Sequence, residues 1–540
     1  MRALLPFALL ILALPVRAQF PIPVVSDGTS HEVVGLAHAS DGGLYAVGTF
    51  GGALALEPDW PLATVEWEAP NGTGFLARFD GDGVLQWAHV LEARRAGFGD
   101  ASSAFPKRIA VLDDGGVVLL GTITPGVLID LDPGAGEAIV QPQTGNPLAF
   151  VVRYGASGEY VWHQAVPTTG AFSTAHRMGL ATEGDAVYVL LPPSPDADPG
   201  APEAQYFAPS LLALDAADGS TRFTAETTSP TSATAEGVAV GGGAVYTLTH
   251  HGSLANQRFT VERHDATSGA ALWSYTPTAG RDRPAAMEAD ASGALYVEGE
   301  LTSSATGVAL DPSAPGTISH SRSGNERAFL GSYSASGALR WSAPAEVNVG
   351  AFGSGFALGS DALFVAGFGT LKSYATADGS LVQTLAAVHG TPSLYSVATT
   401  ASRVSVYAQP RNDGLFAFEG LPEGSPATAI VQLDQSTLSR STSPTAAAPP
   451  ASGAALTLGA ARPHPVARGS EVEVTLASGG HVRLRLFDLL GREAAVFADA
   501  EMASGVHRVR LDARGLASGT YVLVLESGGE RRARTVVLSR

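Results

Sequence analysis

The chain has 540 residues, carries 33 Lys and Arg against 51 Asp and Glu for a formal net charge of −18, and contains no cysteine. The missing cysteines exclude a disulfide framework, so buried apolar area must hold the fold, and the negative charge disfavours nucleic-acid binding, which needs a basic surface. The length fits two to four domains, although a large all-β fold often exceeds about 200 residues as one unit.

The first twenty residues, "MRALLPFALLILALPVRAQF", have the pattern of a secretory leader. Arg2 precedes an apolar run over 3–16 and the small Ala18 marks the cut, so we predict a signal peptide over 1–18 and a mature chain that starts near Gln19. The run is shorter than the ~20 residues of a membrane-spanning helix, which leaves a retained anchor as the alternative. We expect export through the periplasm and no transmembrane segment in the mature chain.

From residue 33 onward one pattern recurs seven times. Each copy has one strand pair around a Gly-rich turn, as in "GLAHASDGGLYAVGTF" from Gly35, and a second pair, as in "AFVVRYGASGEYVW", that ends at an aromatic residue in the first five copies, at Gln383 in the sixth, and is degraded in the seventh. Two hairpins make a four-stranded antiparallel sheet, and such sheets bury both faces only against one another. This predicts an all-β fold, a seven-bladed β-propeller over 19–438, with six or eight blades as alternatives. The predicted blades span 33–90, 107–166, 177–225, 236–275, 285–343, 354–384 and 394–438.

Four of the six tryptophans occupy one repeat position, at the end of the second hairpin: Trp87, Trp162, Trp273 and Trp341. We predict that they lie on the outermost strand and pack against the next blade, while a ring of ligand-stacking aromatics is the alternative. The seventh repeat lacks a clear outer strand. The segment "FPIPVV" from Phe20 is predicted to complete that blade and close the ring.

Repeats one, two and five carry longer spacers, among them "TITPGVLIDLDPGAGEAIV" and "ELTSSATGVALDPSAPGTI". Together with "AFVVRYGASGEYVW" or its equivalent, this pattern resembles the SBBP-type β-propeller repeat of exported bacterial proteins. The resemblance covers most of 33–438. It implies a propeller in an exported protein and no particular activity, because that family is known by its architecture.

The segment "STLSRSTSPTAAAPPASGAA" is rich in Ser, Thr, Pro and Ala, which predicts a linker over 439–454. A compact unit follows over 455–540. Its strands alternate in hydropathy, and the regular turn signals predict a small Ig-like β-sandwich. The clearest alternation places Val482, Leu484 and Leu486 on one face and Arg483 and Arg485 on the other.

This C-terminal unit resembles the type A C-terminal sorting domain of the type IX secretion system. The motif residues are Pro463, Pro465, Asp488, Gly491, Arg492, Leu516, Gly519 and Tyr521. The sequence departs from the family where His464 replaces the usual Asn and where Arg531, Arg532 and Arg534 replace the usual Lys. The resemblance implies that type IX secretion machinery recognises 455–540 and that the unit is removed on export. A permanent carbohydrate-binding sandwich is the alternative.

The chain has no intact catalytic motif: G-x-S-x-G and a P-loop are missing, and "HEVVG" at His31 lacks the second His of H-E-x-x-H. We interpret His250 and His251 as an exposed loop pair that follows a strand. Catalytic residues stay unknown and no cofactor is expected, with calcium as the one weak exception. Its candidate ligands are the oxygen-rich set Asp130, Asp132 and Glu137, and Asp80 and Asp82 form another acidic turn. Both turns also fit ordinary hairpin connections.

The longer spacers at 50–75, 122–148, 191–210 and 301–327 stand on a rigid scaffold, where loops usually carry recognition. We therefore predict a non-catalytic binding or adhesion platform, secreted or attached to the cell surface. Its expected partners are the type IX machinery and a glycan or surface-protein ligand. A polysaccharide-active hydrolase or lyase is the second hypothesis, and a structural cell-surface component is the third.

Overall fold

The structure, a computed structural model, divides into two compact units, Met1–Ser441 and Thr442–Arg540. In the part of the chain that it describes, no helix has the length and apolar character that a membrane crossing requires. The described residues are 22–26, 31–56, 65–91, 93–95, 104–142, 147–167, 178–193, 208–230, 233–251, 258–277, 283–301, 307–315, 317, 320–321, 328–345, 355–367, 369–389, 393–409, 417–418, 429–434, 457–458, 470–476, 479–487, 493–503, 505–511, 516, 519–527 and 530–538.

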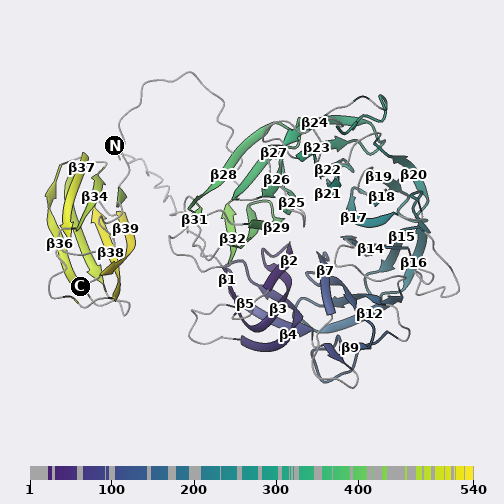
Figure 1. Ribbon diagram of the computed structural model, residues 1–540, viewed down its shortest axis with the longest axis horizontal. Helices are drawn as coiled ribbons and strands as arrows, with labels where there is room; N and C mark the ends of the chain where they lie inside the picture. Colours follow the sequence, from purple (N-terminus) through teal and green to yellow (C-terminus); the bar gives the residue numbers. More distant parts are fainter. Residues whose placement is uncertain are drawn as a thin grey trace, which may run out of the picture. The chain divides into compact units, whose positions relative to one another are not determined.

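The first unit consists of four-stranded antiparallel sheets, the predicted blades, set around a ring (Figure 1). From the inside outward, blade 1 contains β2 (His31–His38), β3 (Leu44–Leu56), β4 (Val65–Phe79) and β5 (Leu85–Leu91). Blade 2 contains β7 (Ala104–Val111), β8 (Val117–Ile123), β11 (Leu148–Tyr154) and β12 (Tyr160–Pro167). Blade 3 contains β13 (Gly179–Glu183), β14 (Ala186–Leu191), β15 (Ser210–Asp215) and β16 (Thr221–Glu226). Blade 4 contains β17 (Thr234–Gly241), β18 (Ala244–His251), β19 (Arg258–His264) and β20 (Ala271–Tyr275). Blade 5 contains β21 (Arg283–Ala289), β22 (Leu295–Glu300), β23 (Ala328–Tyr333) and β24 (Leu339–Ala345). Blade 6 contains β25 (Gly355–Leu358), β26 (Ala362–Gly367), β27 (Thr370–Ala375) and β28 (Leu381–His389).

Blade 7 combines the two ends of the propeller. Its first three strands are β29 (Ser393–Thr399), β30 (Arg403–Gln409) and β32 (Ala429–Asp434), and its fourth is β1 (Ile22–Ser26), which pairs Ile22 with Ile430 (Figure 1). The second half of β1 pairs with β3 of blade 1, so blades 7 and 1 share one hydrogen-bonded sheet. The innermost strands contact one another in sequence around the whole circle. The seven-bladed closed ring is confirmed, with the predicted N-terminal segment as its closing strand.

The described part of the first unit has four further short strands besides those of the blades. β6 (Ala93–Arg95), β9 (Val127–Asp130) and β10 (Ile139–Val140) form a small sheet within the connections around blade 2, and β31 (Ala417–Phe418) extends blade 6 along β28. Two strands of the small blade 2 sheet, β9 and β10, lie inside the spacer 122–148 that the sequence marked as a loop. Part of that spacer is therefore regular structure.

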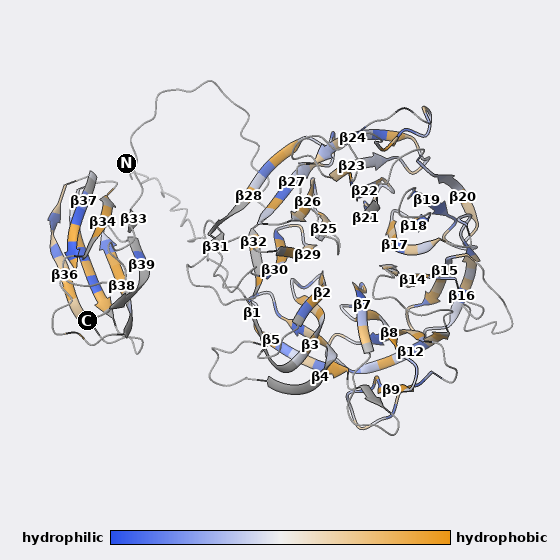
Figure 2. Cartoon of the chain, in the orientation of Figure 1, coloured by the Kyte–Doolittle hydropathy of each residue, from blue (hydrophilic) through white to orange (hydrophobic). Residues whose placement is uncertain are grey.

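The apolar core of the propeller lies between blades. Each neighbouring pair, blades 7 and 1 included, encloses its own cluster of buried apolar side chains. Strand β8 shows why: Val117 and Leu119 pack toward blade 1, whereas Val118 and Leu120 pack toward blade 3, and the whole strand is buried. A middle strand therefore reads as a continuous apolar run, and apolar residues recur along the strands of the ring (Figure 2).

The second unit contains two small antiparallel sheets that enclose one core. The alternation in β35 (Gly480–Phe487) is confirmed, because Val482, Leu484 and Leu486 are buried while Arg483 and Arg485 reach Asp499 and Glu526 at 3.3 and 2.5 Å. One sheet is β33 (Thr457–Leu458), β34 (Ser470–Leu476) and β37 (Gly505–Leu511); the other is β36 (Glu493–Met502), β35 (Gly480–Phe487), β38 (Gly519–Ser527) and β39 (Glu530–Leu538).

Candidate functional site

The four repeat tryptophans lie on the fourth strand of their blades and reach into the next blade. The indole N–H of each donates to a backbone carbonyl there: Trp87 to Ala156 (3.0 Å), Trp162 to Ala216 (2.8 Å), Trp273 to Ala335 (3.0 Å) and Trp341 to Thr376 (2.9 Å). The packing interpretation of these residues is confirmed. They set the position of the neighbouring hairpin turn in four of the seven blade junctions.

A glycine of that hairpin turn lies directly against each indole ring. Gly219 has a φ of 74°, and a Cβ added there would lie 2.7 Å from Trp162. Only glycine tolerates both the positive φ and the close approach. The same contact places Gly158 against Trp87, Gly337 against Trp273, Gly379 against Trp341, and Gly269 against Phe223, which takes the tryptophan position in blade 3. We call each such pair an aromatic–glycine lock.

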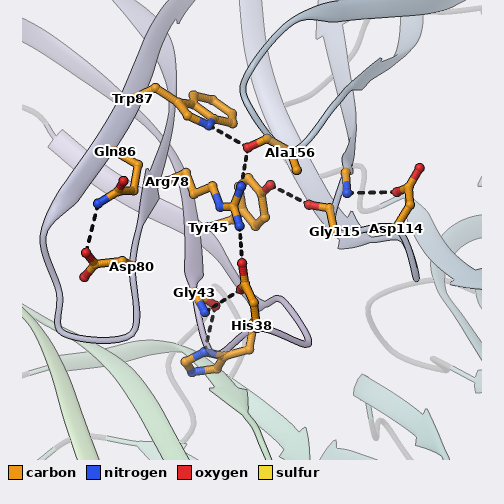
Figure 3. Close-up of polar contacts among 12 residues, drawn as sticks. His38, Gly43, Tyr45, Arg78, Asp80, Gln86, Trp87, Asp114, Gly115 and Ala156 are labelled. Atoms are coloured by element: carbon orange, nitrogen blue, oxygen red, sulfur yellow. Dashed lines mark hydrogen bonds and ion pairs between the residues drawn. The ribbon is translucent and has the colours of Figure 1, made fainter.

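Two arginines join hairpin turns of neighbouring blades, and Figure 3 shows the first of them, Arg78. Arg78 on β4 donates to the Ala156 carbonyl and forms an ion pair with Asp41 at 2.5 Å. Arg153 on β11 repeats this arrangement with Asp114. Each arginine thus joins the first hairpin turn of its own blade to the second hairpin turn of the next blade through charge-assisted bonds, which are stronger than neutral ones.

These turns border a groove made of two adjacent depressions. Asp41 and Gly81 line both, so the two depressions adjoin each other. The smaller, of about 540 Å³, runs along blades 1 and 2 beside Arg78, Asp80 and Trp87. The larger, of about 670 Å³, lies where the first hairpin turns of blades 7, 1 and 2 meet, and its lining includes His38, Asp113, Thr400, Ser402 and Arg403.

Carboxylates, hydroxyls and a guanidinium line the larger depression. Asp41 and Asp113 are exposed, and the hydroxyls of Thr400 and Ser402 lie on the opposite side of the junction. Arg403 extends from blade 7 and donates to the Gly81 carbonyl of blade 1. Fixed acceptors and donors in an open polar groove suit a ligand with many hydroxyl groups better than an apolar one.

One pair beside the groove, His38 and Ser405, has the spacing of a catalytic dyad. His38 Nε2 lies 2.9 Å from Ser405 Oγ, and its Nδ1 donates to the Gly43 carbonyl at 3.2 Å, so the neutral ring accepts a hydrogen bond from the serine. Burial lowers the pKa of His38 to about 4, and Ser405 is fully buried. A weak base beside an inaccessible hydroxyl cannot drive nucleophilic catalysis, and the bond serves to join blade 1 to blade 7.

A buried carboxylate that the sequence pattern did not reveal anchors the connection between blades 3 and 4. Glu262 on β19 is fully buried and accepts hydrogen bonds from the Thr228 N–H at 3.0 Å, the Thr228 hydroxyl at 2.9 Å and the Ser229 hydroxyl at 3.2 Å. His264 lies 3.7 Å away, and burial lowers its pKa. Because these donors satisfy the carboxylate, we assign Glu262 a structural role.

The calcium candidates lie in and beside the β9–β10 connection, where their oxygens already hold the backbone. Asp130 accepts from the N–H groups of Asp132 and Ala138 at 3.0 and 2.9 Å, Asp132 accepts from Gly134 at 2.8 Å, and Glu137 is exposed. In the other acidic turn, Asp80 accepts from the N–H of Asp82 at 2.9 Å. Within the described ranges, no group of three or more His, Asp or Glu side chains is placed to hold a metal ion.

The interpretation of His250 and His251 as a loop pair is wrong. Both are the last residues of β18 and pair with β19, and both are half-buried. His251 Nε2 lies 3.2 Å from Thr260 Oγ1. Adjacent residues of a strand face opposite sides of the sheet, so the two imidazoles do not converge on one site.

The long spacers of blades 2 and 5 have a packing role that the sequence did not indicate. The Leu131 carbonyl accepts from the Tyr154 hydroxyl at 2.8 Å, and the Leu310 carbonyl accepts from Tyr333 at 2.9 Å. Both leucines are buried in the clusters beside these blades. The leucines of the acidic "LIDLDP" and "VALDP" elements therefore anchor these spacers to the core, while Asp132 and Asp311 stay partly exposed.

Three of the sorting-motif residues lie in the described part of the second unit. Leu516 and Tyr521 pack against its core, and Gly519 begins β38. The remaining motif residues, Pro463, Pro465, Asp488, Gly491 and Arg492, lie outside the described residues.

No protein-family model matches the chain. No curated protein sequence matches it either. Among solved structures it is similar to BamB from Moraxella catarrhalis (16% identity, 81% of this chain, 99% of that chain, TM-score 0.29), to the quinohemoprotein alcohol dehydrogenase ADHIIG from Pseudomonas putida HK5 (11%, 79%, 79%, 0.35) and to Hsv2 from Kluyveromyces lactis (9%, 66%, 99%, 0.35). At these identities and TM-scores the likeness carries no functional argument. The propeller assignment rests on strand pairing and on the closed ring.

Proposed function

We propose that the propeller is a non-catalytic binding platform that holds a glycan in the groove across blades 7, 1 and 2. The observation that carries this proposal is the polar lining of the larger depression, which includes the carboxylates of Asp41 and Asp113 from blades 1 and 2 and the hydroxyl of Ser402 and the guanidinium of Arg403 from blade 7. Sugar hydroxyls both donate and accept, so a chain of sugars can use such a lining along its length.

We further propose that the protein is exported and that residues 455–540 are the address read by type IX secretion machinery. The leader pattern over 1–18 and the sorting-motif resemblance support this route. The second unit has its own apolar core, which suits a domain that is recognised as a folded unit. The propeller would then act at the cell surface or in the medium.

Binding to an immobilised glycan array tests the proposed site. We expect Asp113→Ala to weaken the binding of retained glycans roughly tenfold, because a hydrogen bond to a charged group contributes about 1.5–3 kcal/mol. Asp361→Ala is the matched control, since Asp361 is an exposed aspartate in the first hairpin turn of blade 6, outside the groove. This control should bind like the wild type.

Two results would contradict the proposal. Equal binding by wild type and the Asp113 variant would place the ligand elsewhere. Release of soluble products from a polysaccharide panel incubated with the purified propeller would replace the binding platform by an enzyme.

A further inference from the structure

One position of the innermost strand separates blade 5 from the other six blades. Pairing between the first and second strands aligns one residue per blade, which is the cross-strand partner of Tyr45 in blade 1 and of Tyr296 in blade 5. Blade 5 has Glu288 at this position. The other blades have alanine, namely Ala37, Ala110, Ala181, Ala239, Ala357 and Ala398. A carboxyl group thus occupies a position that elsewhere in the ring holds only a methyl group.

The alanines show which way this position faces. Five of them pack in the apolar cluster between their own blade and the next one: Ala110, Ala181, Ala239, Ala357 and Ala398. Glu288 faces the same way, because Met287 packs toward blade 4 whereas Ala286 and the paired Tyr296 pack toward blade 6. Its side chain therefore enters the junction of blades 5 and 6 from the innermost strand of the ring, β21 (Figure 1).

The surroundings of Glu288 in this junction are apolar. The innermost strand of blade 6, β25, contributes Phe356 and Leu358 to the same cluster as Tyr296. In the part of the chain that the structure describes, no hydrogen-bond donor and no cation contacts the Glu288 carboxyl group, and burial alone raises its pKa to about 7. Its side chain is only half-buried, so it keeps some contact with solvent. Glu262, in contrast, is fully buried but satisfied by its donors.

Other ionisable groups also face this junction. Among the described residues they are Asp290, Tyr296, Glu298, Glu300 and Arg340 of blade 5 and Lys372 and Tyr374 of blade 6. The Tyr296 hydroxyl donates to Asp290 at 3.0 Å and accepts from Arg340 at 3.1 Å. Strands β25 and β26 contribute no ionisable residue. None of these groups causes the raised pKa of Glu288, so its apolar surroundings control its protonation.

We propose that Glu288 makes the junction of blades 5 and 6 a proton-sensitive joint, closed when the carboxyl group carries its proton and loosened when the group is ionised. A neutral carboxyl group can remain among apolar side chains, whereas a carboxylate without a donor is stabilised by water. Ionisation therefore favours states in which β21 and β25 separate locally. The other junctions have alanine at this position and lack the response. The joint does not depend on the proposed glycan binding.

The pH dependence of stability tests the proton site. The pKa of Glu288 is about 7 in the folded protein and near 4.5 in the unfolded chain, so its contribution to stability is complete below pH 4.5 and is lost as the pH rises through 7. From pH 5 to pH 8 we expect the unfolding equilibrium constant of the wild type, relative to that of Glu288→Gln, to increase at least about tenfold in urea denaturation. Glu298 and the other groups titrate in both proteins and cancel in this ratio.

Two further variants make the stability test specific. Glu288→Ala introduces the residue type of the other six blades and should give the same pH-dependent difference from the wild type as Glu288→Gln. Glu137→Gln is the matched control, because Glu137 is exposed in the β9–β10 connection, and it should follow the wild type. A ratio to the wild type that stays constant from pH 5 to pH 8 for both Glu288 variants would overturn the proposal.

Hydrogen exchange on the full chain locates the response in the ring. The amides of β25 are compared with those of β13, the innermost strand of blade 3, in the same sample, so that the intrinsic effect of pH on exchange cancels. From pH 5 to pH 8 the exchange rate of β25 relative to β13 should rise at least about tenfold in the wild type and stay constant in Glu288→Gln. A constant ratio in the wild type, or an equal rise in the variant, would overturn the joint.

Discussion

Single glycines decide how closely the blades approach. In blade 3, Gly184 and Gly219 both have positive φ, but a Cβ would meet no atom within 4 Å at Gly184 and the Trp162 ring at 2.7 Å at Gly219. We expect Gly184→Ala to lower the free energy of unfolding by about 1 kcal/mol for the backbone alone, and Gly219→Ala by about 3 kcal/mol because it also overpacks the junction. Urea denaturation of the two variants separates the backbone cost from the packing cost. Equal losses of the free energy of unfolding would refute the aromatic–glycine lock.

The histidine between blades 1 and 7 makes stability depend on pH. Burial lowers the pKa of His38 to about 4, below its unfolded value near 6.5, so its contribution is complete above pH 6.5 and is lost as the pH falls toward 4. The loss should reach about 3 kcal/mol. Other histidines whose pKa burial lowers, such as the half-buried His89, add to the total slope, so the informative quantity is the free energy of unfolding of the wild type minus that of His38→Gln. A difference that stays constant from pH 7 to pH 4 would contradict this origin.

At the scale of elements, the acidic spacer of blade 2 allows a test of whether an acidic composition predicts calcium binding. The oxygens of Asp130 and Asp132 already accept backbone N–H groups, so we expect neither calcium chloride nor EDTA to shift the melting temperature. Asp130→Ala should instead lower stability by about 1–2 kcal/mol with or without calcium, because two backbone donors lose their acceptor. A calcium-dependent melting temperature that disappears in this variant would restore the metal site.

The fourth strands of the blades also differ in how they come to pair with the third strands. Each fourth strand of blades 1 to 6 follows its third strand through a short turn, and in all six a β-bulge lies just before that turn, next to the lock position. The bulge and the turn glycine are local features with a sequence signature. Blade 7 departs from this pattern because its fourth strand, β1, comes from the other end of the propeller. It reaches β32 through closure of the ring and not through a hairpin turn.

For the whole molecule, the two compact units predict separable stability and delivery. A chain that ends at Ser452 keeps every described strand of the propeller and lacks the second unit. We expect it to melt at the same temperature as the propeller of the full chain and to accumulate in the periplasm, because the proposed export signal is gone. Fractionation of producing cells provides the measurement, and normal export of the truncated chain would remove the case for a sorting domain.

The sequence by itself determined the blade number, the tryptophan positions and the alternation in β35. These follow from turn chemistry and from the need of thin sheets to bury both faces, and both leave a periodic record along the chain. Only the tertiary structure showed which glycines lie against those tryptophans. It also showed that His250 and His251 belong to strand β18, where adjacent side chains face opposite sides of the sheet. It also decided the groove, because Arg403 meets the carbonyl of Gly81, 322 residues away, only when the ring closes. Contacts across such a separation depend on the curvature of all seven blades together, and no local pattern records that.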